Sequence, residues 1–357
     1  MSWLFRIVVG FLALKLVNLG INVRRFPVLR PSRLPMRPSV SLLIPMRNET
    51  ARLAETLPTA ATQDVEQLVV LDDRSTDGSA ELARGILAAT PHASVVTGRP
   101  APGGWTGKTW ACTQLAELAT GDVLVFCDSD TVLRPGAVSS ALAEMEHQGA
   151  DVFSVFPRQI TDTLGEHLLV PLIDDALLCF LPFPLLALDV PTAATANGSL
   201  ITMSRAVYDR LDGFATVRSE LADDVALARH ARRSGLRLGL ALGGDLVQIR
   251  MYRGYRATVA GFGRTLLSAF GGSRARLTLA GVFQLAAYLL PLALCRRQRR
   301  WRLVVALGVV ERLLVEAKTG RRQWWQAILV PLSPVAAIPV AGQAMRQSQP
   351  WRGRVYR

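Results

Sequence analysis

Two stretches of about 20 residues carry no charged side chain, and they constrain the fold of this chain more than any other feature. They are residues 277–295 and 323–345. A third apolar stretch, residues 3–21, contains only three charged or strongly polar side chains. Each is long enough to cross a bilayer as a helix, and uncharged runs of this length are rare in soluble domains. The sequence therefore predicts a membrane protein with apolar helices at both ends, in preference to a soluble protein with buried helices.

The charges beside these stretches indicate the orientation of the chain. Five arginines lie within the proline-containing residues 23–38, directly after the first apolar stretch. Basic loops stay in the cytosol, so we expect the polar middle of the chain to be cytoplasmic. A cleaved signal peptide does not fit, because no small-residue cleavage site follows. A basic knot at residues 296–302 and a Glu-Arg pair at 311–312 leave the number of C-terminal crossings open. We expect a multi-pass protein of the cell membrane.

The net charge of +13 comes mainly from arginines that flank the apolar stretches, where they would meet anionic lipid headgroups. No zinc-finger, RNP-like or basic-heptad pattern accompanies the charge, so nucleic acid is not an expected partner. The four cysteines form no C-x-x-C pair, and the four histidines show no zinc-binding spacing. This cysteine usage is typical of a reduced, cytoplasmic setting.

The polar middle of the chain alternates short β-branched runs with helical patterns. Strands without polar alternation, each followed by a helix, indicate an α/β fold with a mostly parallel, Rossmann-like sheet covered on both faces. Ligands of such sheets bind at the carboxyl ends of the strands. The predicted strands are Ser39–Ile44, Gln67–Leu71, Ser94–Thr97, Asp122–Cys127 and Asp151–Phe156.

Acidic residues follow three of these strands, within residues 45–49, 72–78 and 128–130. Each loop has a simpler interpretation as a helix cap or a first-turn carboxylate, as for Asp77 and Glu49. Capping alone does not explain three acidic loops at successive strand ends. In Asp128-Ser129-Asp130, two neighbouring carboxylates repel each other unless a cation lies between them and a ligand. The pattern therefore predicts Mg²⁺ or Mn²⁺ bridging a diphosphate.

The segment around Gly107-Lys108 suggests a phosphate-binding loop but does not match the Walker A spacing, because Pro102 stands where the first glycine is required. Lys108 at the start of a helix can still meet an anion, since its ammonium and the free backbone amides point the same way. The alternative is a solvated lysine.

Taken in order, these motifs resemble the family 2 glycosyltransferases of the GT-A fold. The resemblance covers nearly the whole chain. The closing segment at residues 351–356 and the divided apolar tail are similar to the membrane-bound branch associated with carotenoid and hopanoid glycosylation. The motifs that carry the resemblance are Pro45–Glu49, Asp72–Gly78, Gly107-Lys108, Asp128–Asp130, Ala196–Ser199, Leu211–Phe214, Asp223–Ala228 and Arg250–Tyr252.

This resemblance implies a role for each matching residue. Asp73 would face the uracil of a UDP-sugar, Asp130 would hold the metal on the diphosphate, and Asp128 would bind the ribose or support the metal site. Asp224 occupies the position of the catalytic base in the family motif. The remaining nucleotide-sugar residues are Pro45, Asn48, Glu49 and Lys108. The acceptor-side residues are Asn197, Gly198, Asp223, Arg250 and Tyr252.

The chain departs from the family pattern in three places. The usual Glu-Asp pair is Asp223-Asp224, which keeps the base. The usual Gly-Gly-Phe or Gly-Gly-His is Asp212-Gly213-Phe214. This change alters the backbone of the acceptor loop and therefore bears on the type of acceptor. The motif of processive synthases is not reproduced at residues 248–252, so we expect one sugar to be transferred per acceptor.

The implied reaction is an inverting transfer from a nucleotide-sugar to a lipid or lipid-linked hydroxyl at the cytosolic membrane face. Two alternatives remain: a sugar-nucleotide or polyprenyl-phosphate transferase, and a catalytically silent membrane scaffold. The expected organisation is a membrane anchor (1–22), a basic linker (23–38), the catalytic domain (39–245), an interfacial segment (246–276), membrane segments (277–345) and a basic tail (346–357).

Overall fold

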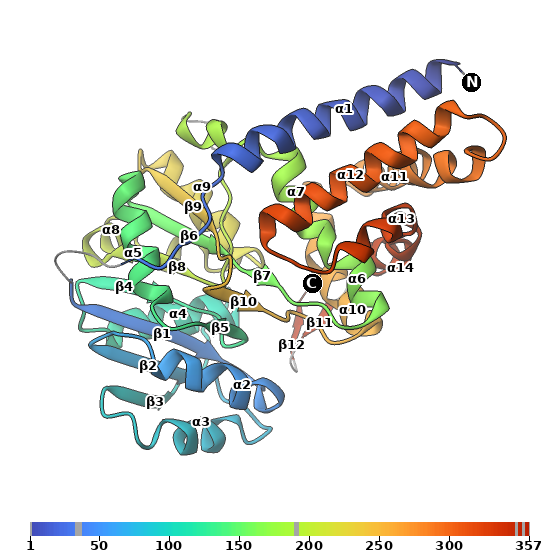
Figure 1. Ribbon diagram of the computed structural model, residues 1–357. Coiled ribbons are helices and arrows are strands. Elements are labelled where there is room, and N and C mark those ends of the chain that lie inside the picture. Colours follow the sequence, from blue (N-terminus) through green and yellow to red (C-terminus); the bar gives the residue numbers. More distant parts are fainter. Residues whose placement is uncertain (1, 33–37, 189–192, 347–348, 352–353, 357) are drawn as a thin grey trace. The chain divides into compact units, whose positions relative to one another are not determined.

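The computed structural model describes residues 2–32, 38–188, 193–346, 349–351 and 354–356, and the chain divides into two compact units (Figure 1). We call Pro27–Arg158 with Pro184–Ile249 the sheet unit. The helical unit comprises Met1–Phe26, Gln159–Phe183 and Arg250–Arg357. Residues 159–183, which we expected within the catalytic domain, thus group with the terminal helices. The functional domain boundaries remain a prediction.

A seven-stranded sheet forms the centre of the sheet unit, in the order β3-β2-β1-β4-β8-β6-β9. The five predicted strands are confirmed, with ends that differ by one or two residues. Strands β8 and β9 were not predicted. Strand β8 is antiparallel to both of its neighbours, whereas the other pairings are parallel. The strands are β1 (Val40–Met46), β2 (Gln67–Asp72), β3 (Ala93–Thr97), β4 (Val123–Phe126), β6 (Val152–Phe156), β8 (Ile201–Ser204) and β9 (Leu238–Leu242).

The register of these strands decides which loops share an edge. Met46 at the end of β1 pairs with Asp72 at the end of β2, so the loops after both strands begin at the same level. Because β8 is antiparallel to β4, Ile201 at its start pairs with Phe126 at the end of β4. The segment before β8 therefore lies at the edge where the parallel strands end.

Helices cover both faces of the sheet, as predicted, because successive strand residues point to opposite faces. Leu42 of β1 packs in a core with α2 (Thr50–Ala61), α3 (Ser79–Leu87) and α5 (Ala137–Gln148). Leu43, one residue further, packs in a second core. That core contains residues of α4 (Gly107–Leu118), α8 (Arg205–Arg210), η3 (Gly213–Val217) and α9 (Asp223–Arg233).

Smaller elements complete the strand inventory. Strand β5 (Thr131–Leu133) pairs antiparallel with β10 (Val247–Ile249) in a three-stranded sheet whose third strand is β7 (Arg158–Gln159). Near the C-terminus, β11 (Gln349–Trp351) pairs with β12 (Arg354–Tyr356).

Apolar helices dominate the helical unit. Among the residues that the structure describes, three regions are long and apolar enough to cross a membrane: Trp3–Arg25, Arg274–Leu294 and Trp324–Ala344. They support membrane association, while the orientation remains a prediction. The third region is divided into three helices, η4, α13 and α14, each of which contains a proline. The helices are α1 (Ser2–Arg25), α6 (Leu164–Leu169), α7 (Pro171–Phe180), η1 (Phe183–Ala187, which continues into the sheet unit), α10 (Tyr255–Ala269), α11 (Arg274–Leu294), α12 (Arg300–Thr319), η4 (Trp324–Leu332), α13 (Ser333–Ala336) and α14 (Ile338–Ala344).

A buried lysine connects four of these helices. The Lys15 ammonium of α1 donates to both carboxylate oxygens of Asp175 in α7 at 3.0 Å, to Glu311 in α12 at 2.7 Å and to the Tyr288 hydroxyl in α11 at 2.7 Å. Asp175, Cys179 and Glu311 bring potential metal-ligand atoms together. The ammonium already supplies a positive charge there, so this group is a structural ion cluster rather than a clear metal site.

The neighbouring Asp174 pairs with Arg321 at 2.8 Å. Both carboxylates of α7 are thus buried and neutralised by basic side chains of the helical unit. The sequence allows two interpretations of the apolar residues 168–191: a segment at the membrane interface, because these carboxylates oppose insertion, or an ordinary pair of core helices. Their pairing favours helices packed within the unit. Residues 189–191 lie outside the described residues.

Candidate active site

The loops after β1 and β2 are joined by hydrogen bonds. The Asp73 amide donates to the Met46 carbonyl at 2.8 Å. Asn48 has a left-handed backbone (φ 52°), its amide donates to Ser75 Oγ, and its side-chain oxygen accepts from the Thr76 amide, both at 2.9 Å. Asparagine tolerates this backbone conformation better than most residues. Asn48 therefore fixes the two loops relative to each other.

Asp73 is buried at the carboxyl end of β2, where Arg47 faces it. The Arg47 guanidinium lies 3.6 Å from the Asp73 carboxylate and also donates to its carbonyl oxygen. Pro45 stands in β1 beside Leu71 of β2. The predicted nucleotide residues of these two strands are thus brought together.

Glu49 connects this pair of loops to the third acidic loop. It is buried at the N-cap position of α2, makes no side-chain capping hydrogen bond, and accepts from Ser129 Oγ at 3.1 Å. Asp77, by contrast, accepts from the amides of Ser79 and Thr50 at the starts of α3 and α2. The capping interpretation is therefore confirmed for Asp77, whereas the Glu49 side chain bonds to the loop after β4 instead of capping α2.

Each carboxylate of Asp128-Ser129-Asp130 has a basic partner. Lys108 Nζ lies 2.8 Å from Asp128 Oδ1, and an Arg52 guanidinium nitrogen lies 2.7 Å from Asp130 Oδ2. The side chains of Asp128 and Asp130 keep 28% and 14% exposure, so ions from solvent can reach them. Carboxylate oxygens are the ligands that Mg²⁺ and Mn²⁺ prefer. This donor set fits the predicted metal, with Arg52 as a competing cation.

Lys108 is the centre of a carboxylate cluster rather than a solvated lysine. The chain turns into α4 at Thr106, whose side chain caps the helix, and the ammonium then faces Asp128 and, at 3.8 Å, Asp223. Burial lowers the pKa of Lys108, but the surrounding carboxylates outweigh it and hold the pKa well above its usual value. Lys108 is therefore a permanent cation at this edge.

Gly198 shows how tightly the cluster is packed. A Cβ atom at this position would lie 2.7 Å from Lys108 Nζ, 3.1 Å from Asp128 Oδ2 and 3.7 Å from Asp224 Oδ2. The Gly198 amide donates to Asp224 Oδ2 at 2.9 Å. Asn197, the preceding residue, is held by Ser154 Oγ, which accepts from its amide at 2.8 Å.

Asp223 and Asp224 occupy the first turn of α9, after Ala222 at the N-cap, so Asp224 is not the N-cap residue that the alternative interpretation required. Asp224 Oδ1 accepts from the Val225 amide at 2.8 Å. Burial raises the pKa of Asp223 to about 7, in opposition to Lys108. Burial also raises the pKa of Asp224 above its usual value. Both carboxylates can therefore exchange a proton closer to neutral pH than a solvated aspartate can.

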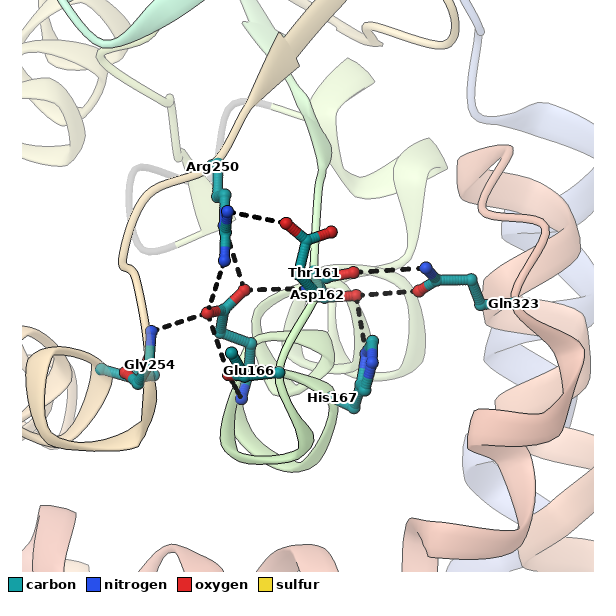
Figure 2. Close-up of polar contacts among 9 residues, drawn as sticks. Thr161, Asp162, Glu166, His167, Arg250, Gly254 and Gln323 are labelled. Atoms are coloured by element: carbon teal, nitrogen blue, oxygen red, sulfur yellow. Dashed lines mark hydrogen bonds and ion pairs between the residues drawn. The ribbon is translucent and has the colours of Figure 1, made fainter. Parts of the chain in front are cut away.

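Two predicted acceptor-side residues, Arg250 and Tyr252, belong to the helical unit. Figure 2 shows Arg250 bound to Glu166, at 3.0 and 3.2 Å, and to Asp162, at 2.6 Å. The Tyr252 ring packs edge-on against Phe262 and lies over Gly261 of α10. The other eleven predicted site residues lie in the sheet unit.

Sequence reasoning missed Glu166, the centre of this polar network. Its side chain is fully buried and accepts hydrogen bonds from Arg250, Thr163 and the amides of Asp162 and Gly254 (Figure 2). Burial raises the pKa of Glu166, but these donors outweigh it and bring the pKa to about 2. Only the Thr163-x-x-Glu166 spacing, typical of a capping box, could have pointed to this residue.

Comparisons with known proteins agree with this architecture. The model of glycosyl transferase family 2 matches residues 41–188. The 4,4'-diaponeurosporenoate glycosyltransferase of Staphylococcus aureus (strain USA300) is 25% identical over 374 residues, which cover 100% of this chain and 98% of that relative. The protein of the same name from Staphylococcus haemolyticus (strain JCSC1435) is 26% identical over 234 residues, and the match spans only 61% of its length and 64% of this chain.

Among solved structures, the mannosyltransferase PcManGT from Pyrobaculum calidifontis, in complex with GDP-Man and Mn²⁺, has a TM-score of 0.55 with this chain. The sequence identity is 18%, and the match covers 96% of this chain and 99% of that one. This likeness shows a shared GT-A fold. Residues 41–188 match the family 2 model on a chain with a GT-A fold, and the protein is a glycosyltransferase.

Proposed function

We propose that this glycosyltransferase moves one sugar from a UDP-sugar to a carotenoid-type lipid at the cytosolic face of the membrane, with inversion at the anomeric carbon. The single observation that carries the proposal is the convergence of Lys108, Asp128 and Asp224 around Gly198. A fixed cation and a carboxylate with a raised pKa are thereby held together at the ligand-binding edge of the sheet.

The donor would lie across the three acidic loops. Asp73 is proposed to bind the uracil, and Asp128 the ribose. Asp130 would hold Mg²⁺ or Mn²⁺, which neutralises charge on the departing diphosphate when bound. Pro45, Asn48, Glu49 and Lys108 would complete the nucleotide-sugar site. The fixed geometry of the loops supports this assignment, because a preformed site loses little conformational entropy on binding.

Asp224 is the proposed general base. It would accept the proton of the acceptor hydroxyl while the acceptor oxygen bonds to the anomeric carbon and the bond to the diphosphate breaks. A base is most effective when its pKa lies near the working pH, and burial moves the pKa of Asp224 in that direction. Asn197, Gly198, Asp223, Arg250 and Tyr252 are the proposed acceptor-side residues.

The names of the relatives and the three candidate spans support a lipid acceptor. The test incubates membranes containing the full chain with labelled UDP-sugars and partitions the products. Label in the organic phase that resists mild alkali is expected for a glycoside of a lipid hydroxyl. Label that stays wholly in water would contradict the lipid acceptor, and alkali-labile label would contradict the hydroxyl.

The base is tested with Asp224→Asn, which removes the proton acceptor and keeps the side-chain shape. Turnover should fall by roughly 10²- to 10⁴-fold, with UDP binding largely intact. The matched control is Asp209→Asn, an exposed aspartate of α8. Equal turnover in the two variants would contradict the assignment of Asp224 as the general base. Loss of UDP binding in Asp224→Asn would assign it to the donor site instead.

A further inference from the structure

The ion pair between Arg52 and Asp130 places a guanidinium on the carboxylate that is proposed to hold the metal. The guanidinium nitrogen lies 2.7 Å from Asp130 Oδ2, and the two side chains are only 20% and 14% exposed. The sequence did not predict this contact, because Arg52 stands 78 positions before Asp130.

The pairing follows from how α2 is attached to the loop after β4. Arg52 lies in the first turn of α2. One turn further, Thr56 Oγ1 donates to the Ser129 carbonyl at 2.7 Å, and at the start of the helix Glu49 accepts from Ser129 Oγ at 3.1 Å. Ser129 is therefore bound by a residue before Arg52 and by a residue after it. This attachment places the Arg52 guanidinium beside Asp130, the residue that follows Ser129.

We propose that Arg52 is a resident counter-cation that competes with the divalent metal for Asp130. This inference rests on the proposed metal site. An arginine stays protonated at any physiological pH, so it is a constant competitor. A metal ion that takes Asp130 Oδ2 must displace the guanidinium from that oxygen, and the free energy of the ion pair is then subtracted from metal binding.

The proposal predicts opposite effects on two ligands. With Arg52 removed, Asp130 binds Mn²⁺ without competition from this guanidinium. Without metal, however, an Asp130 carboxylate that has lost Arg52 repels the diphosphate of UDP more strongly. Arg52→Gln should therefore tighten Mn²⁺ binding and weaken UDP binding in EDTA. Structural damage to the site would weaken both.

The test uses the full chain in detergent micelles. Binding of Mn²⁺ alone is followed by the loss of the free-ion electron paramagnetic resonance signal, and binding of UDP in EDTA is followed by calorimetry. For Arg52→Gln we expect a Kd for Mn²⁺ about threefold to tenfold lower than in the wild type, as an ion pair of this exposure is worth about 1 kcal/mol.

Arg47→Gln is the matched control for Mn²⁺ binding, because it removes a guanidinium that pairs with Asp73. Arg52→Lys keeps the charge and should leave the Kd for Mn²⁺ near the wild-type value. It also keeps the test valid if Arg52→Gln does not fold, since a tenfold gain in Arg52→Lys would then contradict the competition.

Suppose that Asp130→Asn abolishes Mn²⁺ binding but Arg52→Gln leaves the Kd for Mn²⁺ unchanged or raises it. This result would refute the role of Arg52 as a counter-cation and would still support the metal site. Mn²⁺ binding that survives Asp130→Asn instead refutes the metal site and the counter-cation with it. Absence of Mn²⁺ binding in both the wild type and Arg52→Gln also counts against both.

Discussion

Lys108 Nζ lies 2.8 Å from Asp128 Oδ1, so the start of α4 is tied to the loop that follows β4. Without this ammonium, the carboxylates of Asp128, Asp223 and Asp224 would be left close together with no adjacent cation. Lys108→Met should therefore lower the free energy of unfolding by about 1 to 3 kcal/mol, the cost expected when partly buried charged groups lose their partner.

Chemical denaturation of the detergent-solubilised protein measures this loss. The control is Arg84→Gln, which breaks a surface pair with Glu81 and should cost less than about 1 kcal/mol. Similar unfolding midpoints for the two variants would show that the cluster contributes little to stability.

The raised pKa of Asp223 should make the stability of the protein depend on pH. Burial raises its pKa from 3.8 to about 7 in the folded protein, so the native state holds a proton that the unfolded state has lost. Its contribution to stability is therefore complete below pH 3.8 and is lost as the pH rises to about 7. Asp223→Asn should lose less stability than the wild type over this range.

Thermal unfolding at a series of pH values between 4 and 8 measures this difference, with the exposed Asp209→Asn as the control. Parallel curves for the wild type and Asp223→Asn would mean that Asp223 is ionised in the folded protein.

For Glu166 we expect the opposite dependence of stability on pH. Its pKa falls from 4.5 to about 2, so its contribution is present above pH 4.5 and is lost as the pH falls toward 2. Glu166→Ala leaves the Gly254 amide and the Arg250 guanidinium without this acceptor, and we expect a loss of about 3 to 5 kcal/mol at neutral pH.

The measurement is denaturant unfolding, with Glu81→Ala, whose side chain is 77% exposed, as the control. A loss for Glu166→Ala no larger than that of the control would show that the network in Figure 2 stabilises the fold very little.

The ion pairs of Lys15 indicate that α1 stabilises the folded helical unit in addition to its proposed role as a membrane anchor. Lys15→Met leaves Asp175 and Glu311 without their shared cation, and the thermal midpoint in detergent should fall by several degrees. Leu14→Ala, at a side chain that is 70% exposed, should have little effect. The double variant Lys15→Met with Asp175→Asn should recover part of the loss. Equal midpoints for Lys15→Met and Leu14→Ala would refute this role.

The sequence predicted those parts of the fold that local patterns determine. Apolar runs located β1, β2, β3, β4 and β6, and the polar residues at their ends indicated a candidate site. Strands β8 and β9 were not predicted, and the reversed direction of β8 depends on its neighbours in space rather than on a local pattern.

Three ion pairs were not predicted from the sequence, and all three were missed for the same physical reason. Arg52 meets Asp130 from 78 positions away, Glu166 meets Arg250 from 84, and Lys15 meets Asp175 from 160. No periodicity in the sequence indicates which basic side chain neutralises which carboxylate over such separations. Asp224 could be found because it matches a family motif, but its contact with Gly198 depends on the antiparallel strand.

The order of segments in the two units limits how this protein can be shortened. The chain passes from one unit to the other four times, after residues 26, 158, 183 and 249. A fragment of residues 38–245 retains Asp174, Asp175 and Glu166, but it lacks the Arg321, Lys15 and Arg250 that compensate them. Trimming both ends would therefore create three orphaned acidic side chains in one product, and such a product would tend to aggregate rather than yield a soluble enzyme.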